Sequence, residues 1–359
     1  AFPHINSCLD DICVIKSLYA DTFAHASALI QMNSGRVLQG HPTLGSWLGY
    51  GLGSENENLP AYVVMLDPRG GPIAGAANWS SGFMPAAYQG TMFRSTGSPL
   101  LNLATPQGTT EKSQRRGLVL LKDLNGEHAK LRQTRGPIDS ELLARIESYE
   151  LAYRMQTSAA EAVNVENENS KTRAMYGLDK KITSDFGRKC LITRRLIERG
   201  VRFIQLYSGG GHIEDTWDGH NDCISNHKLH AGETDQPIAA LITDLKRSGL
   251  WEETLLVWGG EFGRTPTSEG VNKPGRDHNW HGFTMWLAGG GVKGGQAIGA
   301  TDEFGFEAIE NRVHVSDLHA TMLHLMGLDH NKLTYFHQGL DQKLTGVDRQ
   351  AKVVKKALA

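Results

Sequence analysis

Short apolar runs and longer amphipathic stretches alternate along most of this chain. The apolar runs are hydrophobic at nearly every position, which is typical of buried strands. They lie at 12–18, 61–67, 201–207, 254–258 and 283–288. Hydrophobic residues at helical spacing predict helices, at 25–33, 42–53, 139–199, 235–248 and 314–327. Such alternation indicates a single α/β domain over residues 1–359, with a mostly parallel central sheet and helices on both of its faces.

Two stretches need separate interpretation. Residues 68–135 lose any clear periodicity and are rich in Gly, Ser, Thr and Pro, so we predict an irregular insertion. The aromatic residues in it need burial, so the insertion is expected to pack over the sheet. In the helix at 235–248, Asp235 is the expected N-cap, and Pro237 falls in the first turn, where proline is tolerated.

Composition excludes several classes of protein. The formal net charge is −2, which gives no reason to expect a nucleic-acid partner. No apolar run approaches the length of about 20 residues that a membrane-spanning helix needs. The four cysteines are too few and too scattered for a disulfide framework, and Cys8 and Cys13 are interpreted as structural rather than as a zinc knuckle. Fifteen histidines, most of them after residue 200, direct attention to metal chemistry.

Polar loops rich in carboxylates and imidazoles follow two of the predicted strands, 201–207 and 254–258. Adjacent parallel strands open at the same edge of a sheet, so we expect the two loops to face each other across a crevice. Mixed oxygen and nitrogen ligands suit zinc, manganese or iron better than calcium. The first loop offers His212, Glu214, Asp215, Asp218, His220, Asn221 and Asp222, and the second offers Glu261, Asp277, His278 and His281.

Each of these residues also has an ordinary interpretation. A single loop histidine is often only solvated, and a loop carboxylate often caps a helix, so the metal site is inferred from the two loops together. Arg264 and Arg276 could bind an anionic substrate, or pair with Glu261 or Asp277. The predicted helix start at His25 offers free backbone N–H groups to a phosphate or sulfate. The later histidines at 227 and 230 are interpreted as exposed.

Several segments together resemble one bacterial family. They are DTWDGHND, GLWEETLLVWGGEFGRTP, GRDHNWHGFTMWLAGGGVKGG and VHVSDLHATMLHLMGL, and the resemblance extends over nearly the whole chain. The family is the sulfatase-like group called domain of unknown function 1501, which resembles the alkaline phosphatase and sulfatase superfamily. This resemblance implies an alkaline-phosphatase-like sheet, with one or two metal ions beside a nucleophile at a helix N-terminus.

The resemblance also implies roles for individual residues. Asp218 and His220 resemble the carboxylate and histidine ligands at one strand end. Glu261 stands where sulfatases have the Asp of an Asp-His-Gly motif, and His278 resembles the late histidine ligand. Counting ten residues back from the helix-closing glycine, where those enzymes have Ser, Thr or a modified Cys, gives His25. A histidine can attack phosphorus, act as a general base or bind metal, so a formylglycine sulfatase is not expected.

Other positions depart from the superfamily as well. Phe262 stands where a second-metal histidine would be. Family members begin with a Gly-Gly-Pro-Ser…Asp segment, and this sequence starts after it, so an N-terminal strand and one ligand are expected to be missing. The family also implies a bacterial protein that is exported to the periplasm or cell surface.

These observations lead to one main hypothesis, a metal-dependent hydrolase of phosphate or sulfate esters. The expected substrate is a small anionic ester or a sulfated or phosphorylated glycan, and the expected cofactor is a divalent metal such as zinc, manganese or calcium. The alternatives are a non-catalytic metal- or glycan-binding protein and a phosphotransferase that works through His25. The candidate catalytic residues are His25 and Arg264, and the candidate metal ligands are Asp218, His220, Glu261, Asp277, His278 and His281.

Overall fold

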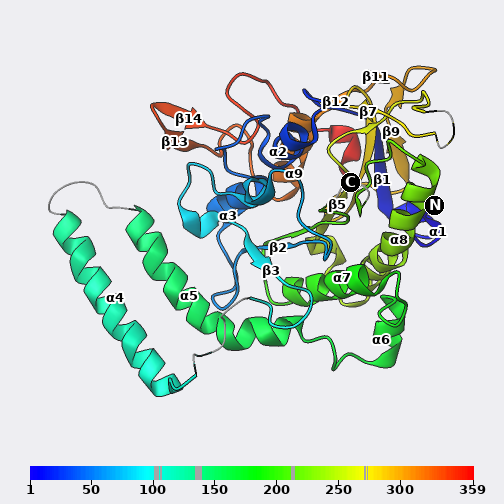
Figure 1. Ribbon diagram of the computed structural model, residues 1–359. Coiled ribbons are helices and arrows are strands. Elements are labelled where there is room, and N and C mark those ends of the chain that lie inside the picture. The colour runs from blue at the N-terminus through cyan, green and yellow to red at the C-terminus, as the bar shows by residue number, and fades with distance from the viewer. Residues whose placement is uncertain (101–104, 106, 134–139, 212–214, 271, 273) are drawn as a thin grey trace.

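A computed structural model describes residues 1–359 apart from 101–104, 106, 134–139, 212–214, 271 and 273 (Figure 1). The α-helices are α1 (Pro3–Asn6), α2 (His25–Ser34), α3 (Leu44–Leu52), α4 (Glu111–Gln133), α5 (Ser140–Val163), α6 (Ser170–Met175), α7 (Ser184–Ile197), α8 (Cys223–Arg247) and α9 (Val315–Leu325). The strands are β1 (Ile12–Tyr19), β2 (Tyr62–Met65), β3 (Thr91–Phe93), β4 (Phe203–Leu206), β5 (Leu255–Trp258), β6 (Gly263–Arg264), β7 (His278–Asn279), β8 (Phe283–Gly289), β9 (Gln296–Ile298), β10 (Ala300–Thr301), β11 (Ala308–Glu310), β12 (Val313–His314), β13 (Tyr335–His337) and β14 (Leu340–Gln342). No helix in the described part of the chain is long and apolar enough to cross a membrane.

The larger sheet has the strand order β12-β1-β8-β5, with β9 also paired to β1. Strand β1 runs parallel to β12 and β9, whereas β8 runs antiparallel to both β1 and β5. The α/β class is therefore confirmed, whereas the prediction of a mostly parallel central sheet is not, because the larger sheet is mixed. The described residues between β5 and β8 form no crossover helix, which is the usual connection between parallel neighbours.

A smaller sheet, β3-β2-β4, is parallel throughout. Strand β4 pairs with β2, and the described residues show no ladder between β4 and β5. The prediction that these two strands are adjacent neighbours in one sheet is therefore wrong. Both strands nevertheless pack against one core, because Ile204 and Leu256 contact the same cluster of buried residues.

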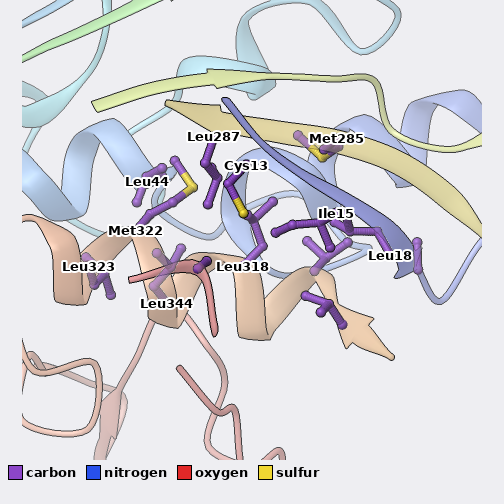
Figure 2. Packing of buried hydrophobic residues seen from close by; sticks show 14 of the residues in the cluster. Cys13, Ile15, Leu18, Leu44, Met285, Leu287, Leu318, Met322, Leu323 and Leu344 are labelled. Carbon is purple, nitrogen blue, oxygen red and sulfur yellow. The ribbon is translucent and has the colours of Figure 1, made fainter. Parts of the chain in front are cut away.

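Helices cover both faces of the larger sheet, as the sequence predicts. Side chains of a strand alternate between faces, and β1 shows this directly. Cys13 and Ile15 pack with α3 and α9, which Figure 2 shows around Leu44 and Leu318. Ile12 points to the opposite face, where the cluster includes residues of α1 and α8.

The structure also corrects three local predictions. Helix α8 begins at Cys223 with Asp222 as its N-cap, so Pro237 lies inside the helix and Asp235 is no cap. The Asp235 carboxylate instead accepts hydrogen bonds from two backbone N–H groups of α1. Because the helix starts earlier, His230 is buried rather than exposed.

The third correction concerns the segment 68–135, which is not irregular throughout. Helix α4 occupies its last third and projects from the body beside α5 (Figure 1). Leu120 and Leu124 of α4 are exposed, and none of the α4 side chains that the structure describes is buried, so the helix lacks there the apolar face that would mark it in the sequence. Gly117 and Gly126 lie inside it, and glycine is a poor helix former, so the sequence favours a loop there.

Candidate metal site

Two loops meet to form the site, as the sequence predicts, although their strands are not neighbours. Asn221 forms an isolated β-bridge with Pro274, and the N–H of Arg276 donates to the carbonyl of Gly219. The contact is so close that a Cβ atom added to Gly275 would lie 1.7 Å from a backbone carbonyl oxygen of the first loop. Only glycine allows this approach, which places the 218–220 segment against the 276–278 segment.

Helix α2 brings a third segment to the site. The helix ends at Gly35, which adopts the left-handed conformation with φ 72° that favours glycine. It is fixed to α9 by the His319 Nε2–H group, which donates to the carbonyl of Met32 over 2.7 Å. At its other end, His25 is the first residue of the helix and reaches the two loops.

Three histidine rings are each oriented by a hydrogen bond between Nδ1 and an oxygen atom. The Nδ1 of His25 lies 2.6 Å from Glu261 Oε1, that of His220 lies 2.8 Å from Glu269 Oε2, and that of His278 lies 2.7 Å from the carbonyl oxygen of Phe23. A carbonyl or carboxylate oxygen accepts hydrogen bonds, so in each pair Nδ1 is the donor. This leaves the opposite nitrogen, Nε2, available as a ligand in all three rings.

The three Nε2 atoms converge on the carboxylate of Asp218. His25 Nε2 lies 3.2 Å from Oδ2, while His220 and His278 place Nε2 at 3.1 Å and 3.4 Å from Oδ1. The Nε2 atoms of His220 and His278 are only 2.9 Å apart, and two lone pairs at that distance repel unless a proton or cation lies between them. His25 Nε2 is buried, and Asp218 Oδ2 is the polar atom that it approaches in the described structure.

These atoms fit a divalent metal well. Zinc binds imidazole nitrogen and carboxylate oxygen at about 2.0–2.2 Å in tetrahedral geometry, which places ligand atoms about 3.3 Å from each other. The four distances given above, from 2.9 to 3.4 Å, are close to that spacing. Three imidazoles and one carboxylate suit zinc, manganese or iron, whereas calcium prefers a larger set of oxygen ligands. Two groups in the described chain satisfy metal-ligand spacing, namely His25, Asp218 and His278, and His220, Asp277 and His278.

Charge is concentrated at Asp218, whose side chain is nearly buried. Burial alone would raise its pKa, but hydrogen bonds to His25 and His278 and the nearby Arg264 guanidinium hold the pKa far below its usual range. His25 shows the complementary effect. Burial would lower its pKa, but the hydrogen bonds and charges of Asp218 and Glu261 outweigh burial and raise the pKa to about 9. Without a metal, His25 is therefore a cation held between two carboxylates.

The predicted site residues take different places in this arrangement. Glu261 contacts His25 Nδ1, so it orients the His25 ring from the side opposite the candidate ligand atom Nε2. Arg264 donates to Asp218 over 2.5 Å and to the carbonyl of Arg276, rather than pairing with Glu261 or Asp277. Exposed Asp277 accepts a hydrogen bond from the backbone N–H of His278, whereas His281 is exposed and outside both metal-binding groups of the described chain. His212 and Glu214 lie outside the described residues.

The sequence reasoning missed the two groups that hold His220 and His278. Glu269 lies 49 positions from its partner His220, within a loop already selected as polar. The other holding group is the backbone carbonyl of Phe23, which leaves no trace in the side-chain pattern.

The N-terminus of α2 gives the site a second property. Its N-cap, Ala24, provides no side-chain hydrogen bond, and Ala28 is the first residue whose N–H is bonded within the helix. Free N–H groups and the positive end of the helix dipole therefore lie beside His25, as in an anion-binding helix terminus.

Comparison with known families assigns the chain. The profile described as "Protein of unknown function (DUF1501)" matches residues 1–358. The chain belongs to the DUF1501 family. The family prediction made from the sequence is thus confirmed over essentially the whole length.

The DUF1501 chain is also similar, at low sequence identity, to several proteins of known structure. One is to Ps i-CgsB in complex with k-i-k-neocarrahexaose, at 12% identity and TM-score 0.42, covering 91% of this chain and 67% of the other. Another is to the PsFucS1 sulfatase from Pseudoalteromonas sp., at 12% identity and TM-score 0.42, covering 98% and 67%. A third is to the phosphonate monoester hydrolase SpPMH from Silicibacter pomeroyi, at 14% identity and TM-score 0.35, covering 91% and 68%. No curated protein matches the chain.

Proposed function

We propose that this DUF1501 protein is a metal-dependent hydrolase of phosphate or sulfate esters, built on an alkaline-phosphatase-like fold. The convergence of three imidazole Nε2 atoms on one carboxylate, each ring oriented through Nδ1, is the observation that supports the proposal most strongly. We assign His25, Asp218 and His278, which form one of the two groups with metal-ligand spacing, as metal ligands, and His220, whose Nε2 lies 2.9 Å from that of His278, as a fourth candidate ligand.

The metal would supply positive charge to stabilise the negative charge that develops on the ester oxygens. Glu261 and Glu269 keep the rings of His25 and His220 in the ligand orientation, so that the site is preorganised. The Arg264 guanidinium partly neutralises the negative charge of the Asp218 carboxylate and holds it in place. The uncapped N-terminus of α2 binds the phosphate or sulfate oxygens.

A water molecule is the nucleophile in this proposal, and Asp277 is the candidate base. Asp277 lies beside His220 and His278 and is exposed to solvent. Its carboxylate can therefore accept a proton from a water molecule next to the metal ligands. His25 is better suited to metal binding than to attack on phosphorus. Its Nδ1 is hydrogen-bonded to Glu261, so only Nε2, which faces Asp218, can offer a lone pair. If Nε2 binds the metal, it cannot also attack phosphorus.

The experiment is hydrolysis of 4-nitrophenyl phosphate and 4-nitrophenyl sulfate by chelator-treated protein to which zinc or manganese is restored. We expect turnover of at least one ester that needs metal and is lost in Asp218→Asn. Asp215→Asn is the matched control, because this exposed acid is on the same loop, outside the ligand set. Metal binding without turnover of any ester would instead support the non-catalytic alternative. A phosphorylated His25 after incubation with a phosphate donor would support the phosphotransferase.

A further inference from the structure

One cysteine of the chain differs from the others in its exposure. Cys223 is half-exposed, whereas Cys8, Cys13 and Cys190 are buried, and all of them are free thiols. Cys223 is also the first residue of α8, directly after the N-cap Asp222. The positive end of a long helix stabilises negative charge on a sulfur atom at this position.

A histidine one helical turn later faces the thiol. His227 Nδ1 lies 3.2 Å from Cys223 Sγ, and the opposite nitrogen, Nε2, lies 3.2 Å from the carbonyl oxygen of Trp217. A carbonyl oxygen can only accept, so Nε2 carries the proton and Nδ1 presents its lone pair to the sulfur. The thiol of Cys223 is therefore the donor to His227.

The surroundings keep the imidazole ready to accept a proton. Burial lowers the pKa of His227 and the Arg264 charge lowers it further, against the opposing effect of the hydrogen bond that Nε2–H donates to the carbonyl of Trp217, so the neutral form of the ring is favoured. The indole of Trp217 packs on the His227 ring, with centroids 5.9 Å apart. A nucleophile, a neutral base and a third group that orients the base are thus arranged in sequence.

We propose that Cys223 and His227 form a nucleophile–base pair, and that Cys223 is the residue at which this protein reacts with small soft electrophiles such as hydrogen peroxide. Neither residue belongs to the candidate metal-binding groups, so this proposal does not depend on the proposed hydrolase activity.

The reaction with peroxide is balanced without any further reactant. The sulfur of Cys223 attacks one peroxide oxygen, an S–O bond forms and the O–O bond breaks. The thiol proton passes to His227 Nδ1 and then to the leaving hydroxide, which becomes water. The sulfur is oxidised to a sulfenic acid, and the peroxide is reduced.

The test is alkylation of the folded, full-length protein by iodoacetamide at pH 7, followed by intact mass measurement and peptide mapping. We expect a single adduct on Cys223, formed faster than the adduct of glutathione under the same conditions, while the three buried cysteines stay unmodified. Replacing the base, in His227→Asn, should slow alkylation of Cys223 by about tenfold or more. Lys228→Ala is the matched control, because it removes an exposed charge from the next position and should leave the rate unchanged.

Measurements on the unfolded proteins show whether a slower rate in His227→Asn comes from the loss of the base or from a change in the intrinsic reactivity of the thiol. In concentrated urea all four cysteines should react, and Cys223 should react at the same rate in the wild type and in His227→Asn. Equal rates of the two proteins in the folded state, or a folded wild type no faster than glutathione, would overturn the proposal. Formation of a peroxide-dependent sulfenic acid on Cys223, trapped with dimedone, would support it, and its absence under peroxide excess would contradict it.

Discussion

The positive charge on His25 in the metal-free protein leads to a measurable dependence of stability on pH. The two carboxylates of Asp218 and Glu261 raise the pKa of this imidazole from 6.5 to about 9. A rise of that size corresponds to about 3 kcal/mol of stabilisation. Because the pKa is higher in the folded state than in the unfolded state, the stabilisation is complete below pH 6.5. It is lost as pH rises through about 9.

The perturbation that isolates this contribution is His25→Asn, which keeps a polar side chain but removes the titration. Urea unfolding of both proteins in the presence of chelator, at pH 6.5 and pH 9.5, gives the free energies of unfolding. We expect the stability advantage of the wild type over the variant to shrink by about 3 kcal/mol between the two pH values. Asp218 does not titrate in this range, because its pKa is depressed, so its own contribution stays constant.

The matched control is His281→Asn, since His281 is an exposed imidazole outside the ligand groups. Its stability relative to the wild type should not change between the two pH values. A stability advantage of the wild type over His25→Asn that stays constant, or grows with pH, would contradict a raised pKa of His25. Such a result would mean that His25 is not charged between Asp218 and Glu261.

Three further predictions concern single substitutions in the loops and in α4. Gly275→Ala forces a Cβ atom to within 1.7 Å of the His220 carbonyl oxygen, so we expect it to lower the free energy of unfolding by about 2–4 kcal/mol in urea titrations. Gly117→Ala, in open space on α4, should instead raise it by up to about 1 kcal/mol; equal effects of the two changes would contradict the close approach of the loops. Glu269→Gln removes the carboxylate that orients His220 and should weaken zinc binding by about 10–100-fold in a chelator competition, whereas unchanged affinity would exclude that role.

Hydrophobic periodicity was enough to locate most of the fold, for a physical reason. A strand or helix that is buried on one or both faces carries its pattern in its own residues, as β1 and α9 do. Which strands pair, and in which direction, depends on contacts between distant segments, and apolar runs such as 254–258 and 283–288 contain no information on direction. The mixed character of the larger sheet therefore could not be read from them.

The candidate site likewise contains some residues that the sequence pattern identifies and others that it does not. Asp218, His220 and His278 could be selected because they lie in polar loops after apolar runs, and His25 could be placed beside them only through the family resemblance. The true start of α8 was missed because Pro237 was interpreted as a first-turn residue, although the structure accommodates it inside the helix. The oriented Nδ1 atoms depend on three-dimensional contacts between separate loops, which a single sequence does not show.

The most direct test of the proposed metal site is the amount of zinc that the protein retains after incubation with zinc and exhaustive dialysis. Inductively coupled plasma mass spectrometry would compare the wild type with the His25→Ala/His278→Ala double variant and with His281→Ala. We expect about one zinc ion per chain in the wild type and in His281→Ala, and almost none in the double variant. No retained zinc in the wild type, or equal zinc in the double variant, would contradict the convergence of these imidazoles on a metal.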